Sequence, residues 1–178
     1  MLAAFTSAAH ADRPRPAGFG TSDFEANKTF GLGLELGDIG GVSGKVFVTR
    51  NQAIDFGIGD LYEGYYVDHN NGGIHLYADY LWHPLVLTKA AAFELPVYIG
   101  VGGRFWDFGY ACDGAGNNCR SANLFGIRVP IGLTFDFNNV PLDIFVQAVP
   151  TLDFYHQYQP HSVYLDFDFS VGIRYWFN

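Results

Sequence analysis

The side chains that could do chemistry are histidines, a cysteine pair and many carboxylates. His161 and Ser162 lie just before Asp166, and a serine, a histidine and a carboxylate together can cleave or transfer a lipid acyl chain. Neighbouring residues of a strand point to opposite faces, so His161 and Ser162 cannot easily pair as base and nucleophile. His75 and Asp79 share one face, but no serine joins them. We therefore predict no catalytic site and no enzyme.

The two cysteines, Cys112 and Cys119, enclose the short segment Asp-Gly-Ala-Gly-Asn-Asn. In an exported protein, two cysteines separated by flexible residues predict a disulfide that closes a small loop. Free thiols or a metal are the alternatives, but a metal site needs further ligands and none lies nearby. A metal site formed by the histidines at 69, 75, 156 and 161 is a further alternative that we do not favour. We predict the disulfide, no metal and no cofactor.

The composition excludes several classes of protein. A formal net charge of −8 argues against nucleic acid as a partner, because phosphates are met by basic patches. Hydrophobic residues make up 49% of the chain, which is too much for a disordered protein. No stretch approaches the roughly 20 apolar residues that a membrane-spanning helix needs. The apolar residues must therefore be placed in another pattern.

The N-terminal region differs from the rest of the chain. Residues 1–11 read MLAAFTSAAHA and end in an A-x-A sequence of the kind that signal peptidase cleaves. We interpret them as the remnant of a signal peptide, the alternative being a flexible cytosolic N-terminus. Residues 12–27 mix prolines, glycines and both signs of charge, and we predict a linker there.

From residue 28 onward, apolar and polar residues alternate with a period of two. In the last segment, for example, Val171, Ile173 and Tyr175 alternate with Gly172 and Arg174. The pattern predicts eight strands, over residues 30–36, 42–48, 54–58, 74–82, 95–105, 125–135, 142–148 and 165–177.

Long strands with one apolar face fit a transmembrane β-barrel, whose apolar face meets lipid and whose polar face lines the interior. A soluble barrel or sandwich would bury the apolar face instead. Two features favour the membrane: the polar face carries charges of both signs, and aromatic residues cluster near segment ends, as interfacial girdles require. Those aromatics are Tyr80, Trp82, Phe105, Phe135 and Tyr175.

The predicted connections have two lengths, as expected of a barrel with short turns at one end and long loops at the other. Tight turns fall near 50–52 and 137–140, and long loops near 59–73, 107–121 and 150–162. Two connections depart from this rule: the one at 37–41 is short for an outer loop, and the one at 84–92 is long for a turn.

The C-terminus resembles the signal that the outer-membrane assembly machinery reads, namely a polar residue, glycine and two aromatics at fixed spacing. Ser170, Gly172, Tyr175 and Phe177 occupy the four positions, with the small departure that Asn178 follows. Over residues 28–178 the chain thus resembles the small outer-membrane barrels of the OmpA and OmpX type. The resemblance implies an all-β, eight-stranded antiparallel up-and-down transmembrane β-barrel, a monomer in the outer membrane of a Gram-negative-type bacterium. It also implies the assembly machinery, outer-membrane lipid and lipopolysaccharide as partners.

An eight-stranded barrel is only wide enough for side chains to fill it, so inward charges must pair or be wet. We predict a salt-bridge network that plugs the interior, with Tyr77, Tyr98, Phe145 and Trp176 adding bulk; a narrow, cation-preferring pore is the alternative. The network residues are Glu35, Lys45, Asp55, Asp79, Glu94, Arg104, Arg128, Asp143, Asp166, Asp168 and Arg174, and His75 and Asp136 also point inward.

Tyrosines cluster in two of the predicted outer loops, where exposed tyrosines with few lysines are typical of adaptable binding surfaces. They are Tyr62, Tyr65, Tyr66, Tyr155 and Tyr158. The alternative is that they pack on each other or sit at the lipid headgroups. The sequence therefore predicts a structural or surface-binding, adhesin-like barrel with an extracellular protein ligand. A lipid-modifying enzyme and a narrow pore are the other candidates.

Overall fold

The computed structural model describes residues 22–37, 39–61, 73–112, 119–155 and 163–177. No helix in these ranges is long and apolar enough to cross a membrane. The described residues form nine β-strands, which are β1 (Phe30–Gly37), β2 (Ile39–Phe47), β3 (Gln52–Leu61), β4 (Ile74–Lys89), β5 (Phe93–Cys112), β6 (Cys119–Arg128), β7 (Ile131–Phe137), β8 (Leu142–Tyr155) and β9 (Val163–Phe177).

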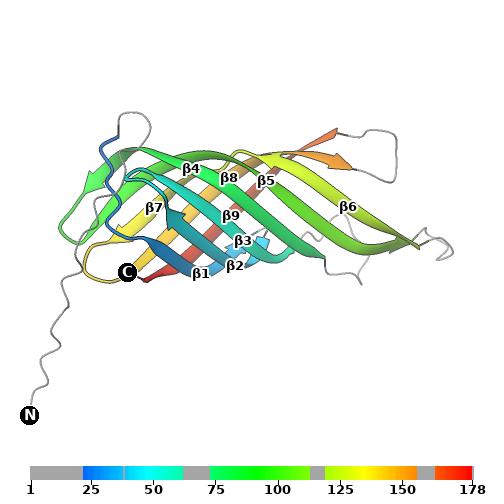
Figure 1. Cartoon of the computed structure of the whole chain (residues 1–178), viewed down its shortest axis with the longest axis horizontal. Coiled ribbons are helices and arrows are strands. Elements are labelled where there is room, and N and C mark those ends of the chain that lie inside the picture. The colour runs from blue at the N-terminus through cyan, green and yellow to red at the C-terminus, as the bar shows by residue number, and fades with distance from the viewer. Residues whose placement is uncertain (1–21, 38, 62–72, 113–118, 156–162, 178) are drawn as a thin grey trace, which may run out of the picture.

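The strands form one antiparallel sheet that closes on itself (Figure 1). From β1 the ladder runs through β2 and β3 to β4, and β4 pairs with β5; in the other direction β1 pairs with β9, and β9 with β8. Both β6 and β7 lie between β5 and β8, so they share one position in the ring. The result is the predicted eight-stranded antiparallel barrel, and closure leaves no sheet edge along its wall.

The shared position of β6 and β7 differs from the sequence prediction of one strand over 125–135. The break falls at Val129 and Pro130, because proline has no N–H to give to the ladder. Two hydrogen bonds hold the break in the wall: Val129 N donates to Pro150 O at 3.0 Å, and Gly100 N donates to Pro130 O at 2.8 Å. The wall therefore continues across the interruption.

Burial alternates along every strand with the polarity reversed relative to a soluble protein. On β9, Val171, Ile173, Tyr175 and Phe177 are exposed, whereas Arg174 between them is buried. The other strands likewise expose leucine, isoleucine, valine and phenylalanine and bury charged residues. An apolar outer surface around a polar interior is the arrangement that lipid requires.

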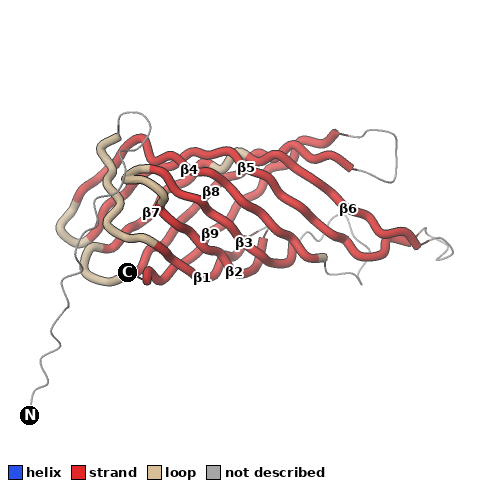
Figure 2. Tube along the Cα trace, in the orientation of Figure 1, coloured by secondary structure: helices blue, strands red, loops and turns tan. Residues whose placement is uncertain are grey.

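At one end of the barrel several strands are longer than predicted. Strand β5 continues to Cys112, β6 already begins at Cys119 and β8 continues to Tyr155, so they take up much of the predicted loops 107–121 and 150–162. Figure 2 shows these strands projecting beyond the rest of the wall. The predicted long turn at 84–92 is also mostly strand, since β4 ends at Lys89 and β5 begins at Phe93.

Four of the large inward aromatic side chains each lie directly opposite a glycine of the neighbouring strand. A Cβ at Gly172 would come within 2.3 Å of the Phe145 ring, and one at Gly57 within 2.4 Å of the Tyr77 ring. The same cross-strand pairing joins Tyr98 to Gly132 and Trp176 to Gly31. These glycines give the rings room to lie flat across a narrow interior.

Candidate functional site

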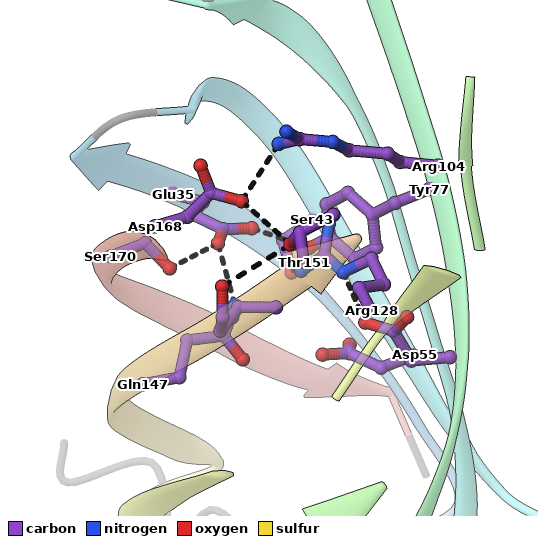
Figure 3. Close-up of polar contacts among 12 residues, drawn as sticks. Glu35, Ser43, Asp55, Tyr77, Arg104, Arg128, Gln147, Thr151, Asp168 and Ser170 are labelled. Carbon is purple, nitrogen blue, oxygen red and sulfur yellow. Dashed lines mark hydrogen bonds and ion pairs between the residues drawn. The ribbon is translucent and has the colours of Figure 1, made fainter. Parts of the chain in front are cut away.

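The candidate site is the barrel interior, where ionisable side chains gather at several levels (Figure 3). Among the described residues, seven carboxylates and five cationic side chains are buried. The carboxylates are Glu35, Asp55, Asp79, Asp136, Asp143, Asp153 and Asp168, and the cations are Lys28, Lys45, Arg104, Arg128 and Arg174. A buried charge is tolerated only when it is paired and hydrogen-bonded, so the contacts at each level decide what the interior can do.

Nearest the projecting strands, Arg104 of β5 gathers three carboxylates from β8 and β9. Its Nε donates to Asp153 at 2.9 Å, its Nη1 to Asp168 at 2.8 Å and its Nη2 to Asp166 at 2.7 Å; Nη2 also contacts Asp153. Thr151 adds a hydroxyl donor to Asp168 at 3.3 Å. One guanidinium thus ties β5 to β8 and β9 across the lumen, with carboxylates in excess.

At the next level, Arg128 and Asp79 form a fully buried ion pair, with Arg128 Nε 3.1 Å from an Asp79 oxygen. The guanidinium of Arg128 also lies 4.0 Å above the centre of the Tyr77 ring. His75 is buried above Tyr77, with the two ring centres 6.0 Å apart, and neither of its ring nitrogens has a hydrogen-bond partner among the described residues. The Asp79 carboxylate therefore faces Arg128 rather than His75.

Glu35 is buried, contacts no cation among the described residues and is held by neutral donors instead. Gln147 Nε2 donates to it at 2.8 Å and Ser170 Oγ at 2.5 Å, and Tyr77 Oη makes a third, shorter contact. Tyr98 then donates to Gln147 at 3.1 Å. Four strands meet at this carboxylate, which fixes the aromatic rings in place.

In the middle of the lumen Arg174 of β9 binds Asp55 of β3. Its Nη2 donates to both Asp55 oxygens, at 2.8 and 2.9 Å, and its Nε and Nη2 reach Ser43 Oγ at 3.1 and 2.9 Å. The guanidinium carbon lies 3.8 Å from the centre of the Phe145 ring. Both charges are fully enclosed, so the cross-section here is filled by an ion pair and an aromatic ring.

At the turn end the cations contact aromatic and imidazole groups. Lys45 Nζ is 2.9 Å from His83 Nε2 and 4.8 Å from the centre of the Tyr98 ring. Asp143 accepts a hydrogen bond from Trp176 Nε1 at 3.1 Å. This level ends in an apolar cluster of aromatic side chains that closes the lumen.

Most of the predicted interior residues lie in the lumen, and the exceptions lie at its two ends. Glu94 is half-buried near the turn end, and Asp166 is half-buried at the opposite end, where it reaches Arg104. Asp136 sits at the turn end against Lys28. Alternation therefore predicts that these residues lie on the inward face, but it does not predict how deep each one lies along the barrel axis.

Sequence reasoning missed several interior residues. Asp153 and His83 continue the inward alternation of Asp143 and Asp79, and carrying the period of two past the predicted strand ends would have found them. Lys28 precedes the first strand and has no periodic signal. Its partner Asp136 lies far along the chain, so no local pattern could have indicated their contact.

No arrangement for acyl transfer or metal binding is seen among the described residues. His161 and Ser162 fall outside them. The described histidines, cysteines, aspartates and glutamates contain no group of three that could hold a metal ion. What the interior can do chemically is bind its own strands together through charge-assisted hydrogen bonds.

The remaining predicted sites have mixed placements. Ser170 and Gly172 face the lumen, where one bonds Glu35 and the other accommodates Phe145, whereas Tyr175 and Phe177 face outward. Cys112 and Cys119 are directly opposite each other in the β5–β6 ladder, but their side chains are not described. Tyr62, Tyr65, Tyr66 and Tyr158 lie outside the described residues, as does the Tyr155 side chain.

Fold and site together define a class. The strands form a closed antiparallel ring with an apolar outer face and a charged, filled interior. Short turns lie at the end of the barrel where β1 starts and β9 finishes. Together these features define a small transmembrane β-barrel. The fold is that of the small outer-membrane β-barrels.

The chain belongs to the family described as "Protein of unknown function (DUF3996)", which matches residues 21–178. No curated protein matches the chain. Among solved structures it is similar to the N-terminal β-barrel domain of Pseudomonas aeruginosa OprF, at 13% identity and a TM-score of 0.54, covering 86% of this chain and 99% of that one. Ail, the attachment invasion locus protein of Yersinia pestis, matches at 13% identity and a TM-score of 0.37, covering 86% of this chain and 100% of that one. The OprF likeness supports the fold alone.

Proposed function

We propose that this protein is a monomeric outer-membrane barrel of a Gram-negative-type bacterium, with a closed interior and no catalytic activity. Its function is to present its projecting strands and loops to a protein ligand outside the cell. The β-barrel assembly machinery inserts it, and outer-membrane lipid and lipopolysaccharide surround it. The single observation that carries the proposal is the contrast between a lumen filled with interlocked side chains and two hairpins that extend beyond the wall.

The filled lumen argues against transport as the main activity. Arg174 and Asp55 with Phe145 occupy the middle of the barrel, and Arg104 with its carboxylates fills the lumen nearer the projecting strands. An eight-stranded barrel has little interior volume beyond such side chains. The interior therefore works as a rigid support, and a steady current of ions would require these buried pairs to separate.

The projecting hairpins supply surface that a membrane anchor alone would not need. Among the described residues, β5 pairs with β4 as far as Asp107, whereas its ladder with β6 continues to Cys112 and Cys119. In the same ranges β9 pairs with β1 from Ser170 onward, whereas its ladder with β8 extends back to Val163. Backbone ladders hold both hairpins in place beyond the rest of the wall. We expect the tyrosine clusters in the outer loops that the sequence predicts.

The experiment is a binding assay with the full chain in lipid nanodiscs, using immobilised extracellular-matrix proteins as probes. We expect saturable binding that falls when the tyrosines at 62, 65 and 66, or those at 155 and 158, are replaced by alanine. The matched control replaces Tyr80, an exposed tyrosine of the barrel wall, and should bind normally. Binding that is equal in all variants, or no binding to any probe, would contradict the proposed surface role.

A planar-bilayer recording tests the closed interior independently. We expect no steady conductance, and at most small, rare, cation-favouring events, because carboxylates outnumber cations in the lumen. Conductance of porin size would refute the proposal that the interior is closed and would favour a pore.

A further inference from the structure

The residues immediately before β1 cross the turn-end mouth of the barrel. On one side, Ser22 Oγ donates to the His83 carbonyl at 2.5 Å and Lys89 Nζ donates to the Asp23 carbonyl at 2.6 Å. On the other side, Lys28 contacts the Asp136 carboxylate. We call residues 22–28 the N-terminal strap. Its two ends are thus held by β4 and by β7, and it leads directly into β1 at Phe30, so it lies over the opening.

Between these two attachments the strap inserts one aromatic side chain into the lumen. Phe24 is only 3% exposed and stacks on His83, with ring centres 5.0 Å apart and an angle of 27° between the rings. It also packs on Phe47 at 5.6 Å, and Phe47 stacks on Trp176 at 5.5 Å. Phe24 is therefore the strap's contribution to the aromatic cluster that fills this end of the barrel.

His83 is arranged to receive that ring. Its Nδ1 lies 3.2 Å from the carbonyl of Asn51, so this nitrogen carries the proton and Nε2 accepts from the Lys45 ammonium at 2.9 Å. The imidazole is thereby fixed in the wall with its face available for stacking. Phe24 covers that face, and beneath it Lys45 and His83 are both enclosed.

The attachment at Lys28 is built from several bonds. Besides Asp136, its Nζ donates to the Phe137 carbonyl at 3.0 Å and to the Leu142 carbonyl at 3.5 Å, at the turn between β7 and β8. The pair is largely buried, unlike Glu25 and Arg50, whose side chains are 72% and 51% exposed. Exposed ion pairs of that kind contribute little stability, whereas a buried lysine with three acceptors fixes the position of the strap.

We propose that the N-terminal strap is a stopper for the turn-end mouth, with Phe24 as the inserted plug and Lys28–Asp136 as its latch. It shields Trp176 and the Lys45–His83 pair from the solvent on that side. The inference goes beyond the proposed surface role, which concerns the opposite end of the barrel. It also means that displacing the strap would change access to the lumen without any change in the loops.

Acrylamide quenching of Trp176 fluorescence tests the stopper in the full chain. Replacing Trp82 and Trp106 by phenylalanine leaves Trp176, which is 2% exposed, as the single reporter. In detergent micelles, Phe24→Ala should raise the Stern–Volmer constant several-fold over the parent. The matched control is Glu25→Ala on the same strap, which should leave the constant unchanged.

A second variant keeps the test decisive if Phe24→Ala does not fold. Ser22→Ala combined with Lys28→Gln weakens both attachments, because it removes the Ser22–His83 bond and the Lys28–Asp136 ion pair. It leaves every aromatic ring in place, and it should also raise the quenching constant. The proposal is overturned if the variant that folds is quenched no more than the parent, or if Glu25→Ala raises quenching equally. Neither readout involves ligand binding, so this test and that of the surface role can fail separately.

Discussion

Arg174→Met tests whether the lumen charges hold the barrel together. Arg174 is fully buried, and its Nη2 donates to both oxygens of Asp55, which is 0% exposed. Removing the guanidinium leaves Asp55 buried without its cation, a change that typically costs about 3–5 kcal/mol. Since about 1.4 kcal/mol is a tenfold change in an equilibrium constant, the unfolding equilibrium should shift by roughly a hundredfold or more.

The measurement is urea unfolding of the protein from phospholipid vesicles, followed by tryptophan fluorescence and by gel mobility without heating. Arg50→Met is the control, because the Arg50–Glu25 pair is exposed and such pairs contribute about 0–1 kcal/mol. Arg174→Met combined with Asp55→Asn should lose less stability than the two single variants added together, because neighbouring groups couple by about 0.5–3 kcal/mol.

Two results would refute this reasoning. One is a loss of less than about 1 kcal/mol for Arg174→Met, which would mean that water or another group already solvates Asp55. The other is strict additivity in the double variant, which would mean that the two residues act independently despite the bonds between them.

Three further predictions concern assembly, the cysteines and the strap. Phe177→Ser should lower the amount of folded protein in the outer membrane, because Phe177 faces outward and ends the predicted assembly signal; unchanged assembly kinetics would count against that role. Cys112 and Cys119 should be oxidised and should stabilise the barrel by about 2–3 kcal/mol, whereas two thiols titrated in the native protein would exclude the bond. Lys28→Gln should lower the urea midpoint, since it leaves the buried Asp136 without its cation, while Glu25→Gln should not; equal midpoints for the two would contradict the latch.

The alternation of side chains predicted the class of fold for a physical reason. A lipid-embedded strand must turn every other side chain to the hydrocarbon and satisfy all its backbone groups in a closed ladder. The segments around Val171, Ile173 and Tyr175 show this requirement directly, and the structure has their side chains outward. The inward face of Arg104, Arg128 and Arg174 followed from the same rule.

Strand ends were predicted less well than strand faces. Asp153, for example, lies in a segment that the sequence predicts as a loop but that is part of β8. Hydrogen bonding to the neighbouring strand continues there although the alternation of apolar and polar residues has stopped. The break at Pro130 was missed for the opposite reason. The alternation of apolar and polar residues continues through it, although proline lacks the N–H that the ladder of hydrogen bonds needs.

Which charges pair was decided only by the tertiary structure. Arg104 meets Asp153, Asp166 and Asp168 because at this level only β6 lies between β5 and β8, and β9 follows β8 in the ring. No spacing along the chain encodes these contacts. The strap is the extreme case. Phe24 and Lys28 lie in an aperiodic segment, and their sites, His83 and Asp136, come together only after β4 and β7 have taken their places in the ring. Period and polarity are local properties of a chain, whereas the register of a closed barrel depends on all its strands at once.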